Sequence, residues 1–477
     1  MATSEGRDGA GRGNGRSVTE GPAGAQPQSE PSRSRLFALL AVQMGVAVIT
    51  LDISLTSTAL PAIASGVGAS ASATIWIINL YYLAVVAALL PMGALGEIHG
   101  HRRVFFAGLL TFAAGSLACG LAWSLPTLAA ARAVLGLGSA AVSATTPALI
   151  RTLYPPARLG RGLGPYALVV GIAFTIGPTA ASAILSAMEW PWLFLLNLPV
   201  ALLAFGLSIR DLPRTERQAR PLDGISATLC AGMFALLLFG VAGAAHGVDR
   251  SLLAMAWLAA AACGCGLWRR EADSVTPILA IDLFRSPVFA LSAATSICAF
   301  AIQGLVFVAL PILFQTGLGY SQVEAGFLIT PWPLTLAVMT LVAAPMADRV
   351  SPGLLGGVGL LVVAGGLALL TTLSPAVGII GIAWRLVLCG IGFGFFQSPN
   401  MKAIMSSVPL HRSGGAGGIL ATSRLLGQSI GAALVAMCMH TLGTDGLVAV
   451  IWLGAGLALC GSATSFLRTL PAVRGHG

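Results

Sequence analysis

Long apolar segments recur along this chain, and short polar stretches containing Pro, Gly and charged residues separate them. Most segments are close to the roughly 20 residues that a helix needs to cross the hydrocarbon core of a bilayer. Because lipid offers no partner to backbone N–H and C=O groups, such segments must be helical. The pattern predicts fourteen membrane-spanning helices, at residues 36–58, 74–95, 104–123, 125–149, 163–187, 190–209, 224–246, 251–268, 288–314, 322–346, 353–373, 377–398, 414–440 and 446–467.

The predicted helices divide the chain into five parts. Residues 1–34, rich in Gly, Ser, Arg, Gln and Pro, predict a disordered tail without the apolar region of a cleavable signal peptide. A first six-helix bundle covers 35–209, and a polar segment with two inserted helices covers 210–286. A second six-helix bundle covers 287–468, and residues 469–477 form a short second tail.

The composition supports an all-α polytopic membrane protein. Charged residues make up 9% of the chain, against about 25% in an ordinary soluble domain, and the mean hydropathy is +0.88. The net charge of +9 does not indicate a nucleic-acid partner, because the basic residues lie at the ends of apolar segments. They are more typical of topology signals, so the expected partner is the lipid bilayer.

The predicted helices define two sides, and the basic residues of the connections lie almost wholly on one of them. One set of connections contains Arg102, Arg103, Arg151, Arg158, Arg161, Arg210, Arg214, Arg217, Arg220, Arg269, Arg270, Arg285, Arg349, Lys402 and Arg412, whereas the other contains Arg250 beside Asp249. Cytoplasmic loops accumulate Arg and Lys. We therefore expect a multi-pass protein of the cytoplasmic membrane with both termini in the cytoplasm.

The cysteines do not indicate a disulfide framework or a metal site. All eight lie in apolar segments, and Cys263 and Cys265 form a C-x-C pair that is a weak metal signal. The six histidines lie at loops and helix ends, which disfavours a membrane-embedded enzyme. No G-x-x-x-x-G-K-[ST] motif is present, so we expect no cofactor and a proton gradient as the energy source.

The two bundles carry related motifs. "RAVLGLG" from Arg132 to Gly138 has a counterpart in "RLVLCGIG" from Arg385 to Gly392, and each begins the fourth helix of its bundle. Parallel internal repeats of this kind occur in secondary transporters. The alternative is a chance recurrence of Gly and Arg in a Gly-rich chain.

The motifs resemble those of the major facilitator superfamily, and in particular of its fourteen-helix drug:proton antiporters. "GALGEIHGHRR" is similar to the signature loop between helices 2 and 3, with Gly93, Gly100, Arg102 and Arg103 in register and Glu97 in place of the usual Asp. The resemblance implies a gating loop in which the carboxylate and the arginines make charge-assisted contacts. A plain positive-inside loop is the alternative.

Two further motifs carry the resemblance in the first bundle. "LAAARAVLGLGSAAV" is similar to the fourth-helix motif, with Arg132, Gly136 and Gly138. A buried Arg should face a partner or water, unless it extends to the headgroups. "GLGPYALVVGIAFTIGPTAAS" is similar to the fifth-helix antiporter motif, in which Gly171 and Gly177 favour close helix packing and Pro178 a pliant point. The two residues at 181 and 182 depart from the family's usual glycines.

Charged and polar residues within predicted helices complete the candidate site. "LDISLTSTALPAI" contains Asp52, and "WPWLFLLNLPV" and "GGILATSRLLGQSIGAAL" match family patterns in helices 6 and 13. The last of these places Arg424 within the membrane. Asn79 stands where some cation-exporting members have an acid. We expect Asp52, Asn79, Arg132 and Arg424 to serve proton coupling or substrate binding, with a permanent Asp52–Arg132 pair as the alternative role of the acid.

The resemblance implies two bundles that rock about a central cavity. The function it implies is proton-coupled export of amphipathic or cationic small molecules by a monomer. Uptake of a small nutrient by proton symport is the alternative within transport. A sensor that resembles a transporter but moves no substrate is the alternative outside it.

Overall fold

The computed structural model describes residues 33–69, 71–155, 158–215, 223–245, 248–271, 281–320, 322–373, 377–442 and 446–470. Both predicted tails therefore lie almost wholly outside the described residues. Within these residues the chain is helical and contains no strand. The predicted all-α membrane fold is confirmed, since thirteen helical spans are long and apolar enough to cross a membrane and α6 contains 29 residues.

The first half of the chain forms one helical bundle. Its elements are α1 (Arg33–Thr58), α2 (Leu60–Gly66), α3 (Ala71–His99), α4 (His101–Gly120), α5 (Leu125–Leu153), α6 (Leu159–Ala187), α7 (Trp192–Leu195) and α8 (Asn197–Asp211). α3 and α4 both pack on α5, while α6 and α8 pack on α1. Apolar side chains from these helices form a continuous core.

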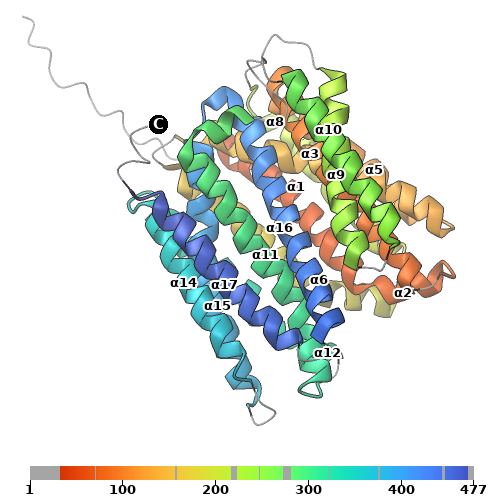
Figure 1. Cartoon of the computed structure of the whole chain (residues 1–477). Helices are drawn as coiled ribbons and strands as arrows, with labels where there is room; N and C mark the ends of the chain where they lie inside the picture. The colour runs from red at the N-terminus through yellow and green to blue at the C-terminus, as the bar shows by residue number, and fades with distance from the viewer. Residues whose placement is uncertain are drawn as a thin grey trace, which may run out of the picture.

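The second half repeats this arrangement. Its elements are η2 (Ile281–Arg285), α11 (Pro287–Thr316), α12 (Gln322–Ile329), α13 (Pro331–Met346), α14 (Pro352–Leu370), α15 (Ile379–Ser406), η3 (Leu410–Arg412), α16 (Ser413–Leu442) and α17 (Gly446–Leu467). α14 packs on α15 and α17, and α11 packs on α16 and α17. Figure 1 shows α14, α15 and α17 side by side at one flank of the molecule.

The inserted pair, α9 (Gly224–Ala245) and α10 (Arg250–Glu271), lies at the periphery. α9 packs against α3 of the first half and α16 of the second, whereas α10 packs against α9. The Trp76 ring of α3 meets the Phe239 ring of α9 at a centroid distance of 6.0 Å. The inserted pair thus covers one of the two lines along which the halves meet (Figure 1).

Sequence chemistry explains several helix boundaries. α5 begins after Ser124, whose hydroxyl accepts a hydrogen bond from the Thr127 N–H in a capping box. α4 begins after Gly100, whose φ of 94° is a conformation that favours glycine. The predicted span 322–346 is divided into α12 and α13 at Thr330. Thr330 keeps helical dihedral angles, but the following Pro331 has no N–H to continue the ladder of helical hydrogen bonds.

The two halves meet mainly at one end of the molecule, which we call the Glu97 end. Helices α3 and α5 contact α16 there, and α6 contacts α13 and α15. Apolar residues of the second half join the core of the first half, namely Leu283, Phe289, Ala293, Met401, Ile404, Met405, Val408, Ala416, Ile419, Ala421 and Leu425. At the opposite end α2 and α12 pack mainly within their own halves (Figure 1).

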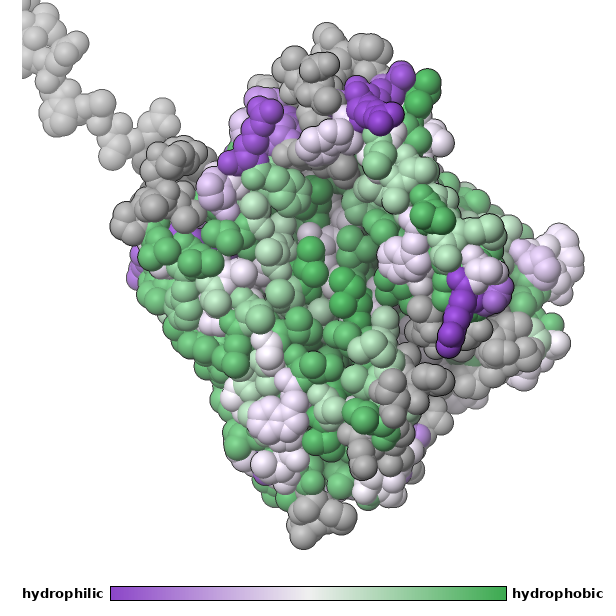
Figure 2. All heavy atoms as spheres, viewed as in Figure 1, coloured by the Kyte–Doolittle hydropathy of each residue, from purple (hydrophilic) through white to green (hydrophobic). Residues whose placement is uncertain are grey.

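The surface in Figure 2 is consistent with a bilayer environment. Hydrophobic side chains cover most of this face, and hydrophilic side chains gather mainly at its upper edge. Large apolar residues such as Leu258, Ile380 and Trp452 are exposed on the helices. In water such a surface would drive aggregation, whereas lipid tails solvate it.

Candidate functional site

Asp52 lies in a buried ion pair inside the first half. Its side chain is 1% exposed, as is that of Arg132. Arg132 Nη1 of α5 donates to Asp52 Oδ2 at 2.6 Å, and Asn197 Nδ2 of α8 donates to Asp52 Oδ1 at 3.0 Å. Both carboxylate oxygens are therefore satisfied, as a buried charge requires.

Aromatic rings complete the surroundings of this pair. The Arg132 guanidinium carbon lies 4.4 Å from the centre of the Tyr81 ring and 5.7 Å from that of Phe194. Such cation–π contacts stabilise a desolvated arginine. Arg132 is thus enclosed within the protein and does not extend to the headgroups. The structure contains the Asp52–Arg132 pair that the sequence left open, and it adds Asn197, which the sequence offered only as part of a motif.

Asn79 of α3, also a predicted site residue, is not among the residues that contact the Asp52 carboxylate. Asn79 is half-buried, and the hydrogen bonds to the Asp52 carboxylate come from Arg132 and Asn197. A role for Asn79 in coupling or substrate choice stays a prediction.

Glu97 joins the two halves. Its side chain is fully buried on α3, and Arg412 Nη1 of η3 donates to Glu97 Oε2 at 3.0 Å. The Gly415 N–H of α16 donates to Glu97 Oε1 at 2.8 Å. Arg412 also binds Asp282 of η2, with Nε donating to Oδ2 at 3.0 Å. The donors of these two bonds to Glu97, Arg412 and Gly415, both belong to the second half of the chain.

Glycines bring the backbones together beside this contact. A Cβ atom added to Gly93 would lie 2.6 Å from the carbonyl oxygen of Gly414. A Cβ atom on Gly417 would lie 2.5 Å from the carbonyl oxygen of Ala144. Only residues without a side chain permit this approach of α16 to α3 and α5. The Glu97 end is therefore closed by packing as well as by charge.

Arg151 makes a second polar link at the Glu97 end. Its Nη1 donates to Ser413 Oγ at 3.0 Å, and its Nη2 donates to the Val408 carbonyl at 2.7 Å. The sequence identified Arg151 only as a topology charge. Its partners are more than 250 positions away along the chain, so no local pattern could have revealed the link.

The arginines of the signature loop do not share the cross-half role of Glu97. Arg102 Nη2 donates to the Ile209 carbonyl of α8 at 2.5 Å, and its guanidinium carbon lies 5.1 Å from the Phe106 ring centre. Both partners belong to the first half, and Arg103 is exposed. α4 begins after Gly100 and packs on α8, the helix that contains Ile209. In this structure Glu97 binds Arg412, and a contact between the loop's carboxylate and its own arginines in another state stays a prediction.

The remaining motif glycines pack helices against one another. Added Cβ atoms would lie 2.7 Å from the Tyr81 carbonyl oxygen at Gly136 and 2.4 Å from the Phe112 nitrogen at Gly138. Gly171 faces Ala337 of α13 across the boundary between the halves, while Gly177 faces Ser54 of α1. The backbone at Pro178 is helical, and its side chain lies outside the described residues.

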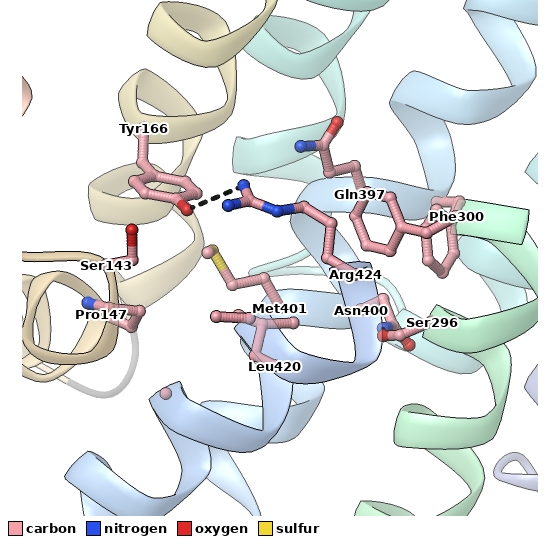
Figure 3. A pocket seen from close by; sticks show the side chains of 13 residues that line it. Ser143, Pro147, Tyr166, Ser296, Phe300, Gln397, Asn400, Met401, Leu420 and Arg424 are labelled. Carbon is pink, nitrogen blue, oxygen red and sulfur yellow. Dashed lines mark hydrogen bonds between the residues drawn. The ribbon is translucent and has the colours of Figure 1, made fainter. Parts of the chain in front are cut away.

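A cavity lies between the halves, near the middle of the helices. Two adjoining pockets share Ser143, Tyr166 and Arg424. Apolar and neutral polar residues form the rest of their described walls: Val46, Ile49, Thr50, Ile53, Tyr82, Pro147, Phe174, Ser296, Phe300, Phe396, Gln397, Asn400, Met401, Gly417, Leu420, Ala421, Leu425 and Gln428. Figure 3 shows the Arg424 side chain extending toward Tyr166, whose hydroxyl oxygen is 3.5 Å from Arg424 Nη1.

The described wall of the cavity contains one of the charged residues predicted for the site, Arg424, and does not contain another, Asp52. Arg424 was expected within the membrane, and it lines the cavity. Asp52 was expected to be able to meet a substrate, yet it is not among the described wall residues, and its carboxylate faces Arg132 and Asn197. Thr50 and Ile53 of the same helix do line the cavity, because they lie on its other face. In the described part of the chain no three His, Cys, Asp or Glu side chains are grouped to hold a metal ion.

Comparisons with known proteins agree with this architecture. The family model described as Major Facilitator Superfamily matches residues 43–432. The chain is 42% identical over 452 residues to the "Uncharacterized transporter YebQ" of Escherichia coli K12, covering 94% of this chain and 99% of that protein. It is 32% identical over 410 residues to the "Tetracenomycin C resistance and export protein" of Streptomyces glaucescens, covering 84% and 75%.

A solved structure shows the same fold. The proton:xylose symporter XylE matches with a TM-score of 0.64 and 17% sequence identity, over 92% of this chain and 96% of that chain. At this identity the likeness concerns the arrangement of helices and not the transported substrate.

Proposed function

We propose that this chain, which belongs to the Major Facilitator Superfamily of membrane transporters, exports amphipathic small molecules in exchange for protons. The observation that carries the proposal is the cavity between the two halves, together with cross-half contacts concentrated at the Glu97 end. A site at the interface of two repeats, closed at one end, is the arrangement that alternating access requires. The export function named for the Streptomyces relative supports the direction.

The orientation follows from charge. The Glu97 end carries Arg102, Arg151 and Arg412, and positive charge marks the cytoplasmic side. We infer that this end faces the cytoplasm and that the structure is an outward-facing state of a monomer. Cysteines introduced at Ser186 and Gly319 should then react with an impermeant thiol reagent added outside cells, whereas a cysteine at Gly160 should not. The opposite pattern would reverse the orientation.

The Asp52–Arg132 pair is our candidate for proton coupling. The contacts from Arg132 and Asn197 favour the ionised form of the Asp52 carboxylate, whereas its burial opposes that form. If rocking of the halves loosens these contacts, desolvation favours protonation. Proton uptake by Asp52 would then be linked to the conformation of the cavity, because Thr50 and Ile53 on the same helix line it.

Proteoliposomes test the proposal directly. With an acidic lumen, an antiporter should accumulate a compound inside as protons leave, and nigericin should abolish the accumulation. A symporter would instead accumulate the compound when the outside is acidic, which is the alternative of nutrient uptake. The compounds are cationic dyes, quaternary ammonium compounds, neutral antibiotics, amino acids and organic anions, with protein-free liposomes as the baseline. Proton movement that no compound changes would contradict the export proposal.

A further inference from the structure

The central cavity has an uneven charge. Among the described residues that line its two pockets, Arg424 is the one charged side chain. The remaining walls combine aromatic and aliphatic side chains, such as Phe300, Phe396 and Leu420, with neutral polar groups such as Gln397 and Gln428. The cavity is therefore apolar with a single fixed positive charge.

Arg424 has more side-chain N–H donors than its described hydrogen bond uses. It is half-buried on α16, and its described side-chain hydrogen bond is the 3.5 Å contact of Nη1 with the Tyr166 hydroxyl. This distance is at the long limit for a hydrogen bond. A guanidinium presents five N–H donors in a planar fork. Figure 3 shows the group reaching across the pocket, beside Met401 and below Gln397.

The two buried acids of the first half, Asp52 and Glu97, are already paired. Asp52 is bound by Arg132 and Asn197 and is not among the described wall residues. Glu97 is bound by Arg412 and Gly415 at the end of the molecule. Neither carboxylate neutralises Arg424 in this state.

From this arrangement we infer that the cavity selects amphipathic organic anions, whose carboxylate or sulfonate binds Arg424 while the apolar body contacts the aromatic wall. This inference rests on the cavity being the transport site proposed above. A guanidinium matches the geometry of a carboxylate through two parallel hydrogen bonds. Aromatic walls can also attract organic cations, but a fixed positive charge in the same cavity opposes them.

Three fluorescent probes with a common dansyl group separate charge from shape. Dansylglycine is an anion, dansylamide is neutral and dansylcadaverine is a cation at pH 7. Their equilibrium binding to the purified full-length protein would be measured in phosphatidylcholine nanodiscs, with empty nanodiscs subtracted. We expect dansylglycine to bind about tenfold tighter than dansylcadaverine, the effect of one charge-assisted contact. Equal binding, or tighter binding of dansylcadaverine, overturns the inference.

Variants of the arginine locate the effect. Arg424→Gln should weaken dansylglycine binding about tenfold and leave dansylamide within about twofold, whereas Arg424→Lys should retain part of the preference because it keeps the charge. Arg385→Gln is the matched control, since Arg385 is an arginine of the second half that donates to the Gly381 carbonyl and does not line the cavity. Unchanged dansylglycine affinity in Arg424→Gln contradicts the inference, as does an equal loss in Arg385→Gln. Because binding needs no gradient, these outcomes are distinct from a failure of proton-driven export.

Discussion

The pairs Asp52–Arg132 and Glu97–Arg412 are both buried, but they join different parts of the molecule. Asp52 and Arg132 belong to α1 and α5 of the first half, so a rigid rotation of that half can carry both together. Glu97 and Arg412 belong to opposite halves, 315 positions apart, so the halves cannot separate at this end without breaking the pair. The first pair is suited to internal stability or coupling, and the second to holding one conformation.

The number of partners differs as well. Among the described residues, Arg132 has one carboxylate partner, Asp52. Arg412 binds two carboxylates in the same part of the chain, those of Glu97 and Asp282. Removing one acid therefore strands the first arginine but not the second. The same substitution, carboxylate to amide, should have different consequences at the two sites.

The largest effect is expected from Asp52→Asn. This change leaves the Arg132 guanidinium buried without a counter-charge, which should destabilise the protein by about 3–5 kcal/mol. Thermal unfolding of the purified protein in detergent measures it. The double variant Asp52→Asn with Arg132→Gln should recover most of the loss, since it buries two neutral groups.

The double variant also tests whether Asp52 couples proton movement to transport. If Asp52 carries the proton, the double variant should be folded and should bind substrate, yet it should show no gradient-driven transport. A folded double variant that retains full coupling would remove Asp52 from the mechanism. An unrecovered stability would show that the pair has further partners.

Glu97→Gln should mainly change the conformational equilibrium. Arg412 keeps Asp282, and each half keeps its own core, so the unfolding temperature should change little. Loss of the cross-half charge should favour the state open at the Glu97 end and slow turnover by about tenfold, which corresponds to about 1.4 kcal/mol. Turnover in proteoliposomes and substrate affinity at equilibrium should be measured together. Normal turnover with a large loss of affinity would place Glu97 in substrate binding instead.

Helix positions could be predicted from the sequence because the bilayer imposes them. Lipid requires long apolar helices, and charge at their ends follows from the positive-inside rule. All fourteen expected spans have a counterpart, although α15 continues to Ser406, beyond the expected end at 398. Its polar last turns lie at the Glu97 end, where Asn400 and Lys402 find protein partners and not lipid.

The partners of the charged residues could not be predicted in the same way. Glu97 was identified from its position in the signature loop, and Arg132 from its family motif and because a charge within an apolar segment is costly. Arg412 and Asp282 looked like ordinary loop residues, since their pairing depends on how distant segments meet. The position of Arg424 could be predicted in part. The sequence placed it in a membrane helix, but its place in the cavity depends on how α16 packs against both halves.

Arg151→Gln should have a smaller effect than Glu97→Gln at the same end. Its partners, Ser413 and the Val408 carbonyl, are neutral, and a lost hydrogen bond of this kind contributes about 1 kcal/mol. We expect turnover to fall by about two- to fivefold, with unchanged substrate affinity. Spin labels at Arg103 and Ser406, in a background lacking the eight native cysteines, should report a wider distance distribution. A loss of turnover larger than that of Glu97→Gln would show that closure depends on Arg151 more than on the buried pair.

The smallest effect is expected at the exposed pair between Asp223 and Arg270. Arg270 Nε donates to Asp223 Oδ2 at 2.6 Å, but the two side chains are 45% and 40% exposed, Arg270 first. The hydrogen bond from Arg270, supported by that from Ser226, holds the pKa of Asp223 well below its usual range. A carboxyl with a lowered pKa stabilises the fold above its unfolded pKa of about 3.9, and this contribution is lost only as the pH falls below that value. Between pH 5 and 8 this contribution is fully present, and Asp223→Asn removes it, but water and salt screen an exposed pair. The unfolding temperature of Asp223→Asn should therefore fall only slightly below that of the parent protein, by the same amount throughout this pH range. Asn also keeps a side-chain oxygen for the Ile225 and Ser226 N–H groups at the start of α9. A decrease as large as that of Asp52→Asn would mean that burial is not what separates the ion pairs of this protein.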